Sequence, residues 1–320
     1  MRNLLSFVLL ALALPLHASR IFVTNERAGT VTVFDSSSKR TIATGPVGTR
    51  PRGIALTPDG KWLLVAVSHF RGQPSKTPDE VIVLDANTLK ISRHYKAGTD
   101  PEGIAITPDG NRFCVANEDA GTASVVDVST GKTLAALVTG TEPEGVAASP
   151  DGKWIYVTAE TSNTVTVIGA RRGAVTANIF VDARPRAAIF AHDSARAWVS
   201  SEVAGSINVI DVKNRRTVAH IKLRPQDHPV GMALSPDGKR LYAATGRGNA
   251  VAVLDTTSNR ILQYINVGSR PWGIALSRDG KTLYAANGLS NDISVIDTAA
   301  GRVTATIKAG DGPWGVAIAP

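Results

Sequence analysis

Residues 271–285 read PWGIALSRDGKTLYA, and this pattern returns along the whole chain. In each copy a proline is followed two positions later by glycine, or by Ala187 in one copy, and then by a short apolar run. The prolines are Pro51, Pro101, Pro143, Pro185, Pro229, Pro271 and Pro313, spaced by 50, 42, 42, 44, 42 and 42 residues. Self-similarity at a fixed period of this length indicates a repeat architecture.

Each copy has room for four short strands. An Asp-Gly turn follows the first apolar run in five copies, and a second apolar run follows the turn. A β-branched stretch comes next and ends at aspartate in most copies, as in ISVID at 293–297, and a fourth stretch covers 302–307. Four short strands per period of about 42 residues predict a β-propeller blade. Two departures are Asp193-Ser194 in place of Asp-Gly and Gly169 in place of the strand-ending aspartate.

The two ends of the sequence are incomplete copies that complement each other. The repeats begin with a second-strand pattern, IFVTN at 21–25, and finish after a first-strand pattern at 315–319. We therefore expect the C-terminal strand to pair with the three N-terminal strands, which removes exposed sheet edges. Six internal copies plus this composite predict an all-β fold, a seven-bladed β-propeller of four-stranded blades that forms a single domain over residues 19–320.

The N-terminus has the layout of a signal peptide covering residues 1–18. Met1-Arg2-Asn3 precede the apolar residues 4–14, and a small residue, Ala18, ends the segment. A membrane anchor is the alternative, but about 11 apolar residues are fewer than the roughly 20 that span a bilayer. We expect cleavage after Ala18 and a periplasmic, monomeric protein that does not span the membrane. Cys114 is the only cysteine, so no internal disulfide can form.

The formal charge of +8 arises from dispersed basic residues. No basic run is longer than two residues, so the charge predicts long-range attraction to acidic partners rather than a nucleic-acid site.

IFVTN at 21–25 and IYVT at 155–158, with the Pro-Asp-Gly turns, resemble the repeat of YVTN-family β-propeller proteins. The exported seven-repeat layout most resembles the propellers associated with catabolism that depends on pyrroloquinoline quinone (PQQ). The resemblance implies a non-catalytic periplasmic binding or scaffold protein, accessory to PQQ-dependent alcohol oxidation. Its partner would be a quinoprotein dehydrogenase, a cytochrome, a transporter component or a small ligand.

A ring of side chains is expected at one mouth of the central channel, where loops on a rigid scaffold can carry function. The residues after the repeat prolines are Arg52, Glu102, Glu144, Arg186, Val230, Trp272 and Trp314, and the loops after the second strands bring Glu26, Ser68, Glu118, Glu160, Glu202, Gly246 and Gly288. Arginines bind carboxylate or phosphate, and tryptophans stack on rings. The candidate ligand-binding residues are Arg52, Glu102, Glu144, Arg186, Trp272, Trp314, His69 and His228. Alternatively, these charges pair with one another and fill the mouth.

Glu26, Glu118, Glu160 and Glu202 are candidate ligands for a divalent cation at the mouth, which suits calcium better than zinc. No other cofactor is expected. The 50-residue spacing places a long loop at 68–79, either a recognition lip or a surface insertion.

No catalytic motif is present, so catalysis stays an open question that leans towards none. The scaffold function is the main expectation. One alternative is a metal-dependent lactone or ester hydrolase at the mouth, with His69 or His228 as base. Another is an electron-transfer propeller in which Trp272 and Trp314 stack on a quinone or tetrapyrrole.

Overall fold

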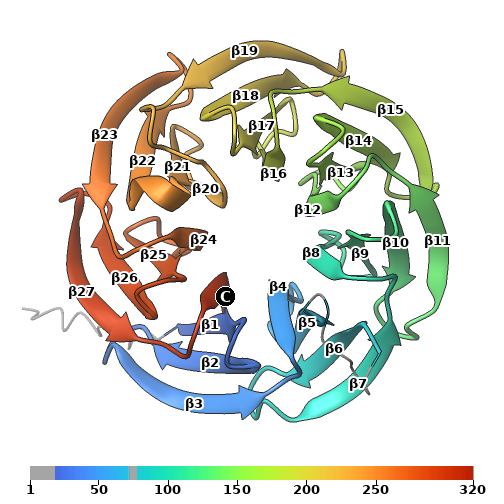
Figure 1. Cartoon of the computed structure of the whole chain (residues 1–320), viewed down its shortest axis with the longest axis horizontal. Helices are drawn as coiled ribbons and strands as arrows, with labels where there is room; N and C mark the ends of the chain where they lie inside the picture. Colours follow the sequence, from blue (N-terminus) through green and yellow to red (C-terminus); the bar gives the residue numbers. More distant parts are fainter. Residues whose placement is uncertain (1–18, 71, 73–77, 320) are drawn as a thin grey trace, which may run out of the picture.

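The computed structural model describes residues 19–70, 72 and 78–319, so the expected signal peptide lies outside the described residues. In the described part, seven four-stranded antiparallel sheets stand in a ring around a central axis (Figure 1). The predicted seven-bladed propeller is confirmed. The one helical element described is a 3-10 turn, η1 (Gly246–Gly248). No described helix has the length and apolar character to cross a membrane.

Within each blade, the four strands are named here in order from the innermost strand, next to the axis of the ring, to the outermost strand at the rim. The first three blades hold β28 (Pro313–Ile318), β1 (Arg20–Asn25), β2 (Thr30–Asp35) and β3 (Arg40–Pro46); β4 (Arg50–Leu56), β5 (Trp62–Ser68), β6 (Glu80–Asp85) and β7 (Ile91–Lys96); and β8 (Pro101–Ile106), β9 (Arg112–Asn117), β10 (Thr122–Asp127) and β11 (Thr133–Val138). The next two hold β12 (Pro143–Ala148), β13 (Trp154–Ala159), β14 (Thr164–Gly169) and β15 (Ala174–Phe180); and β16 (Pro185–Phe190), β17 (Arg196–Ser201), β18 (Ser206–Asp211) and β19 (Arg216–Lys222). The last two hold β20 (Met232–Leu234), β21 (Arg240–Ala244), β22 (Ala250–Asp255) and β23 (Arg260–Asn266); and β24 (Pro271–Leu276), β25 (Thr282–Asn287), β26 (Asp292–Asp297) and β27 (Arg302–Lys308).

The ring closes as the sequence predicts. The C-terminal strand β28 pairs antiparallel with β1, and Val316 lies opposite Val23. One blade therefore contains both ends of the repeat region, which meet at the bottom of Figure 1.

The core consists of seven apolar clusters, and each lies between two adjacent blades. In one, Val31 and Val33 of β2 pack against Leu63 and Val65 of β5. The alternation of β-branched residues in the second and third strands supplies these contacts, because successive side chains point to opposite faces of a sheet. Cys114 is fully buried in such a cluster, as a small apolar residue would be.

The blade of β20–β23 is the most irregular. Its inner strand β20 has three residues, whereas the other inner strands have six or seven.

The departure from the repeat at Asp193-Ser194, between β16 and β17, does not alter the turn, since the Ser194 amide donates to the carbonyl of Ala191 at 2.9 Å. Ser194 takes the positive φ of 59° that glycine supplies at this position in other copies.

Candidate functional site

Close contact between inner strands presents one side chain per blade at the mouth. A Cβ added to Gly145 would lie 2.2 Å from the carbonyl oxygen of Arg186 in the next blade, and Gly103 stands in the same relation to Glu144. Gly103 and Gly145 therefore leave the space that this approach needs. Hydroxyls join the blades at the same level, as where Thr24 donates to the carbonyl oxygen of Arg52 at 2.8 Å.

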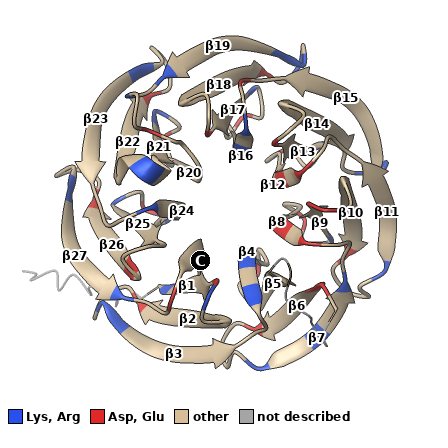
Figure 2. Ribbon diagram, in the orientation of Figure 1, with Lys and Arg blue, Asp and Glu red and all other residues tan. Residues whose placement is uncertain are grey.

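Charged residues of both signs ring the mouth (Figure 2). On one side Arg52 binds Glu26 through Nε at 2.7 Å and Glu102 through Nη1 at 2.7 Å. Arg50 lies beside it, contacts Asp100, and reaches Glu102 at 3.1 Å. Both guanidiniums thus bridge carboxylates from different blades.

The opposite side repeats this arrangement around Arg186. Its guanidinium binds Glu144 at 2.8 Å and also contacts Glu160. Arg184 binds Glu160 at 2.8 Å, and Arg270 lies 3.4 Å from Glu202. The expectation that mouth charges pair between blades is therefore correct for these residues.

Two tryptophans lie between the two charged groups. The rings of Trp272 and Trp314 stack with centroids 6.3 Å apart and planes 24° from parallel. Arg52 lies over Trp314 and Arg186 over Trp272, each 5.5 Å from the ring centroid. These contacts hold the guanidiniums in place by cation–π attraction.

The mouth is hollow. A cavity of about 430 Å³, the mouth cavity, is lined by Glu26, Arg50, Arg52, Phe70, Asp100, Glu118, Glu144, Arg184, Arg186, Glu202, Arg247, Arg270 and Trp272. Its volume suits a small ligand, since ligand pockets generally have a few hundred Å³ and a few convergent polar groups. The five acidic and six basic side chains nearly balance, so the cavity does not demand a strongly charged ligand.

Three carboxyl groups meet at one side of the mouth cavity. Ligand atoms of Asp100, Glu102 and Glu118 lie within 4.8 Å of one another. Burial raises the pKa of Glu118 to about 8, and neighbouring carboxylates, Glu144 first, add to the rise. Burial also raises the pKa of Glu102, although Arg52 opposes this effect. A carboxyl group with a pKa of about 8, as in Glu118, retains its proton near neutral pH.

The four candidate metal ligands do not come together in the described structure. Glu26 is bound by Arg52, while Glu160 and Glu202 lie against Arg184. Glu118 instead lies close to Asp100 and Glu102. Both of these carboxylates are ion-paired to Arg50. Guanidiniums therefore already balance most of the carboxylates that a cation would need.

The two histidines lie apart from the cavity lining. Nδ1 of His69 is 2.7 Å from Asp79, whose other oxygen accepts the amide of Asp100 at 2.8 Å. His228 makes a backbone bond to Thr245 at 2.9 Å. Neither is among the residues that line the mouth cavity. Half of the long loop at 68–79 lies outside the described residues, but Phe70 from it lines the cavity.

Several site residues lie at positions other than the residue after each proline and the loops after the second strands, and they were not predicted. Arg50, Asp100, Arg184 and Arg270 all precede a repeat proline and line the same cavity. Three of them, Asp100, Arg184 and Arg270, have positive φ values of 51–60°. Charged residues directly before the repeat prolines were the available signal. No such signal in the sequence marked Arg247 of η1, because its blade departs from the repeat pattern.

This ring and its polar cavity define a seven-bladed propeller with a candidate ligand site at one mouth. A family model described as "Lactonase, 7-bladed beta-propeller" matches residues 15–139 and 174–320. The chain belongs to this family.

Solved structures share the fold at low sequence identity. A periplasmic gluconolactonase of Pseudomonas aeruginosa has a TM-score of 0.79 and 19% identity over 94% of this chain and 99% of that one. A Bacteroides fragilis protein provisionally described as a 6-phosphogluconolactonase has a TM-score of 0.78 and 20% identity over 95% and 98%. Hydrazine synthase of Kuenenia stuttgartiensis has a TM-score of 0.78 and 24% identity over 88% and 93%. Comparison with curated proteins gave no match.

The expected function needs correction. The prediction of a non-catalytic scaffold for PQQ-dependent alcohol oxidation is wrong, because the family match points to a lactonase-type propeller. The repeat motifs on which it rested specify blade geometry, which many functions share. The hydrolase alternative agrees better with the findings.

Proposed function

We propose that the protein hydrolyses a lactone in the mouth cavity and opens the ring to a hydroxy acid. Membership in the lactonase family is the observation that carries the proposal. The near balance of charges in the cavity favours a neutral, polar substrate over a polyanion. The expected export belongs to the same proposal, in which the enzyme works in the periplasm.

The cavity holds the two kinds of group that ring opening needs. Glu118 accepts a proton from water as the water oxygen bonds to the lactone carbonyl carbon. A carboxylate with a pKa of about 8 is a stronger base than an ordinary glutamate. The ring C–O bond then breaks, and the proton passes to the ring oxygen.

Arginines on the other side of the cavity stabilise the negative charge. Arg247 and Arg270 line the cavity and can donate to the oxyanion and later to the product carboxylate. We assign no step to a metal, because Arg50 already pairs with Asp100 and Glu102.

The test is the release of hydroxy acid from a panel of five- and six-membered lactones by the purified protein. We expect Glu118→Gln to lower kcat/KM by about 100-fold or more, because an amide cannot accept the proton. The wild-type rate should rise with pH through about 8, where Glu118 becomes ionised.

Glu80→Gln is the matched control, since Glu80 pairs with His94 at 2.9 Å and does not line the mouth cavity. It should keep the wild-type rate. Hydrolysis of no lactone, or full activity of Glu118→Gln, would refute the proposal. Loss of the activity on dialysis against a chelator, with recovery on adding calcium, would instead assign the chemistry to a bound cation.

A further inference from the structure

A second, apolar cavity lies in the channel beneath the mouth. In six of the seven copies, the residue two positions beyond the mouth residue lines this cavity. This second layer consists of Ile54, Ile104, Val146, Met232, Ile274 and Val316. The sequence thus places a ring of hydrocarbon directly below a ring of charge.

The apolar layer does not fill the channel. The space within it, the channel cavity, has a volume of about 200 Å³. Although they are near the axis of the ring, Ile54, Val146, Met232 and Val316 keep part of their surface exposed. Unfilled apolar space of this size at the centre of a rigid ring is a place for a ligand.

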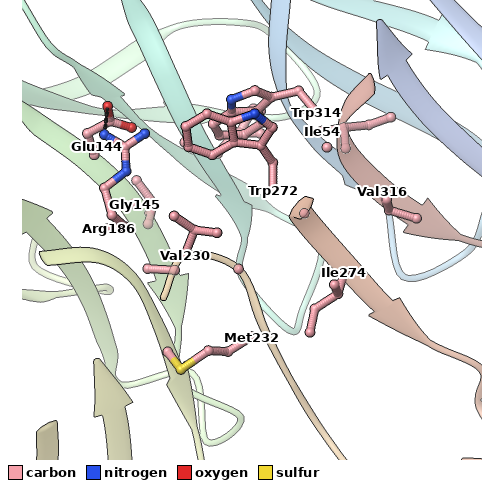
Figure 3. A pocket seen from close by; sticks show the side chains of 18 residues that line it. Ile54, Glu144, Gly145, Arg186, Val230, Met232, Trp272, Ile274, Trp314 and Val316 are labelled. Atoms are coloured by element: carbon pink, nitrogen blue, oxygen red, sulfur yellow. Dashed lines mark hydrogen bonds and ion pairs between the residues drawn. The ribbon is translucent and has the colours of Figure 1, made fainter. Parts of the chain in front are cut away.

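The channel cavity adjoins the mouth cavity. Glu144, Arg186 and Trp272 line both of them. In Figure 3 the charged pair of Glu144 and Arg186 and the two tryptophans lie at one end, and Met232 and Ile274 lie at the other. A molecule bound at the mouth can therefore direct an apolar substituent past Trp272 into the channel.

We propose that the channel cavity binds a straight hydrocarbon substituent of the substrate, so that the preferred substrates are alkyl-substituted lactones. This inference rests on the proposed function and adds the substrate class. The apolar residues below Glu144 and Arg186 disfavour a hydroxylated or charged tail, because buried polar groups without partners are costly. Apolar cavities of about 150 Å³ bind benzene, so about 200 Å³ holds a chain of roughly six carbons.

The first measurement is kcat/KM for γ-lactones whose alkyl substituent grows from none to eight carbons. Each buried methylene should raise kcat/KM about fourfold, and the rise should stop near six carbons. In parallel, calorimetric titration with 1-alkanols of the same lengths measures binding without any reaction.

Two variants change the size of the cavity in opposite directions. Val146→Phe fills it and should remove the dependence on chain length in both measurements. Met232→Ala enlarges it and should move the optimum to longer chains. Val175→Phe, on the outer strand β15 where Val175 is 38% exposed, is the matched control and should keep the wild-type dependence. Circular dichroism and the melting temperature establish that each variant is folded.

The results separate this inference from the function on which it rests. If lactones are hydrolysed at rates that do not depend on chain length, and alkanols do not bind, the channel inference is overturned and the proposed function stands. If no lactone is hydrolysed but alkanols bind with the fourfold increments that Val146→Phe abolishes, hydrolysis is overturned and the hydrocarbon site is supported. A chain-length dependence that Val146→Phe leaves intact places the tail elsewhere and overturns the inference.

Discussion

At the scale of single residues, the glycine two positions after six of the seven repeat prolines matters most for the site. Its missing side chain lets neighbouring inner strands approach, and this approach places the mouth residues within reach of partners in other blades. Gly145 shows how little space remains, since an added Cβ would also lie 2.9 Å from Cα of Ala187. The atoms it would meet belong mainly to the backbone, which cannot move aside as a flexible side chain can.

We therefore expect Gly145→Ala to lower the free energy of unfolding by about 2 kcal/mol, because the overpacked contact forces two inner strands apart. Denaturant unfolding measures the change. Gly169→Ala is the matched control, since a Cβ there meets no atom closer than 3.7 Å, and it should stay within about 1 kcal/mol of the wild type. Equal stability of the two variants would show that the strands are not in limiting contact.

The sequence alone predicts part of this site. The mouth positions of Arg52, Glu102, Glu144 and Arg186 follow from the repeat, because one residue per copy occupies an equivalent place. The pairing of each guanidinium with carboxylates from different blades does not follow, since it depends on blade spacing and on rotamers. His69 and His228 were included by their nearness along the chain, and their side chains line neither the mouth cavity nor the channel cavity.

At the scale of strands, the element that closes the ring is β28. It provides the innermost strand for a blade whose other strands are β1, β2 and β3. Partly buried Val316 and Ile318 pack against the cluster that contains Ile21 and Val23. The period of the repeat predicts this pairing, because each end lacks what the other supplies. The short strand β20 could not be predicted, because its copy of the repeat keeps the proline and the glycine and so looks like the copies that form longer inner strands.

Removal of residues 313–320 should lower the melting temperature by on the order of 10 °C or more, because the loss exposes the edge of β1 and part of that cluster. A synthetic peptide of residues 313–320, added to the truncated protein, should restore part of the lost stability by pairing with β1. A truncated protein as stable as the full chain would mean that the ring does not depend on this strand. Restoration by a scrambled peptide would mean that the effect is not strand pairing.

At the scale of the whole molecule, charge is distributed in two different ways. The chain carries a net charge of +8, yet acidic and basic side chains nearly balance in the mouth cavity. The positive excess therefore lies mainly outside the mouth cavity, where it affects solubility and encounters rather than the site. A basic exterior around a nearly neutral cavity fits an enzyme that binds a small uncharged substrate and then releases an anionic product.

The closed ring also bears on export, because β1 begins at Arg20 and needs little chain before it. Ser19 joins the blade through its carbonyl oxygen, which accepts the amide of Ser36 at 3.0 Å, and Arg20 accepts the amide of Ala319 at 2.8 Å. Cleavage after Ala18 would thus leave every described blade contact in place. We expect the protein from a periplasmic extract to have the intact mass of a chain that begins at Ser19 and to elute as a monomer. Its melting temperature should match that of recombinant 19–320. An uncleaved chain recovered with the membrane fraction would contradict the export proposal, whereas a cleavage site inside β1 would contradict the closure of this blade.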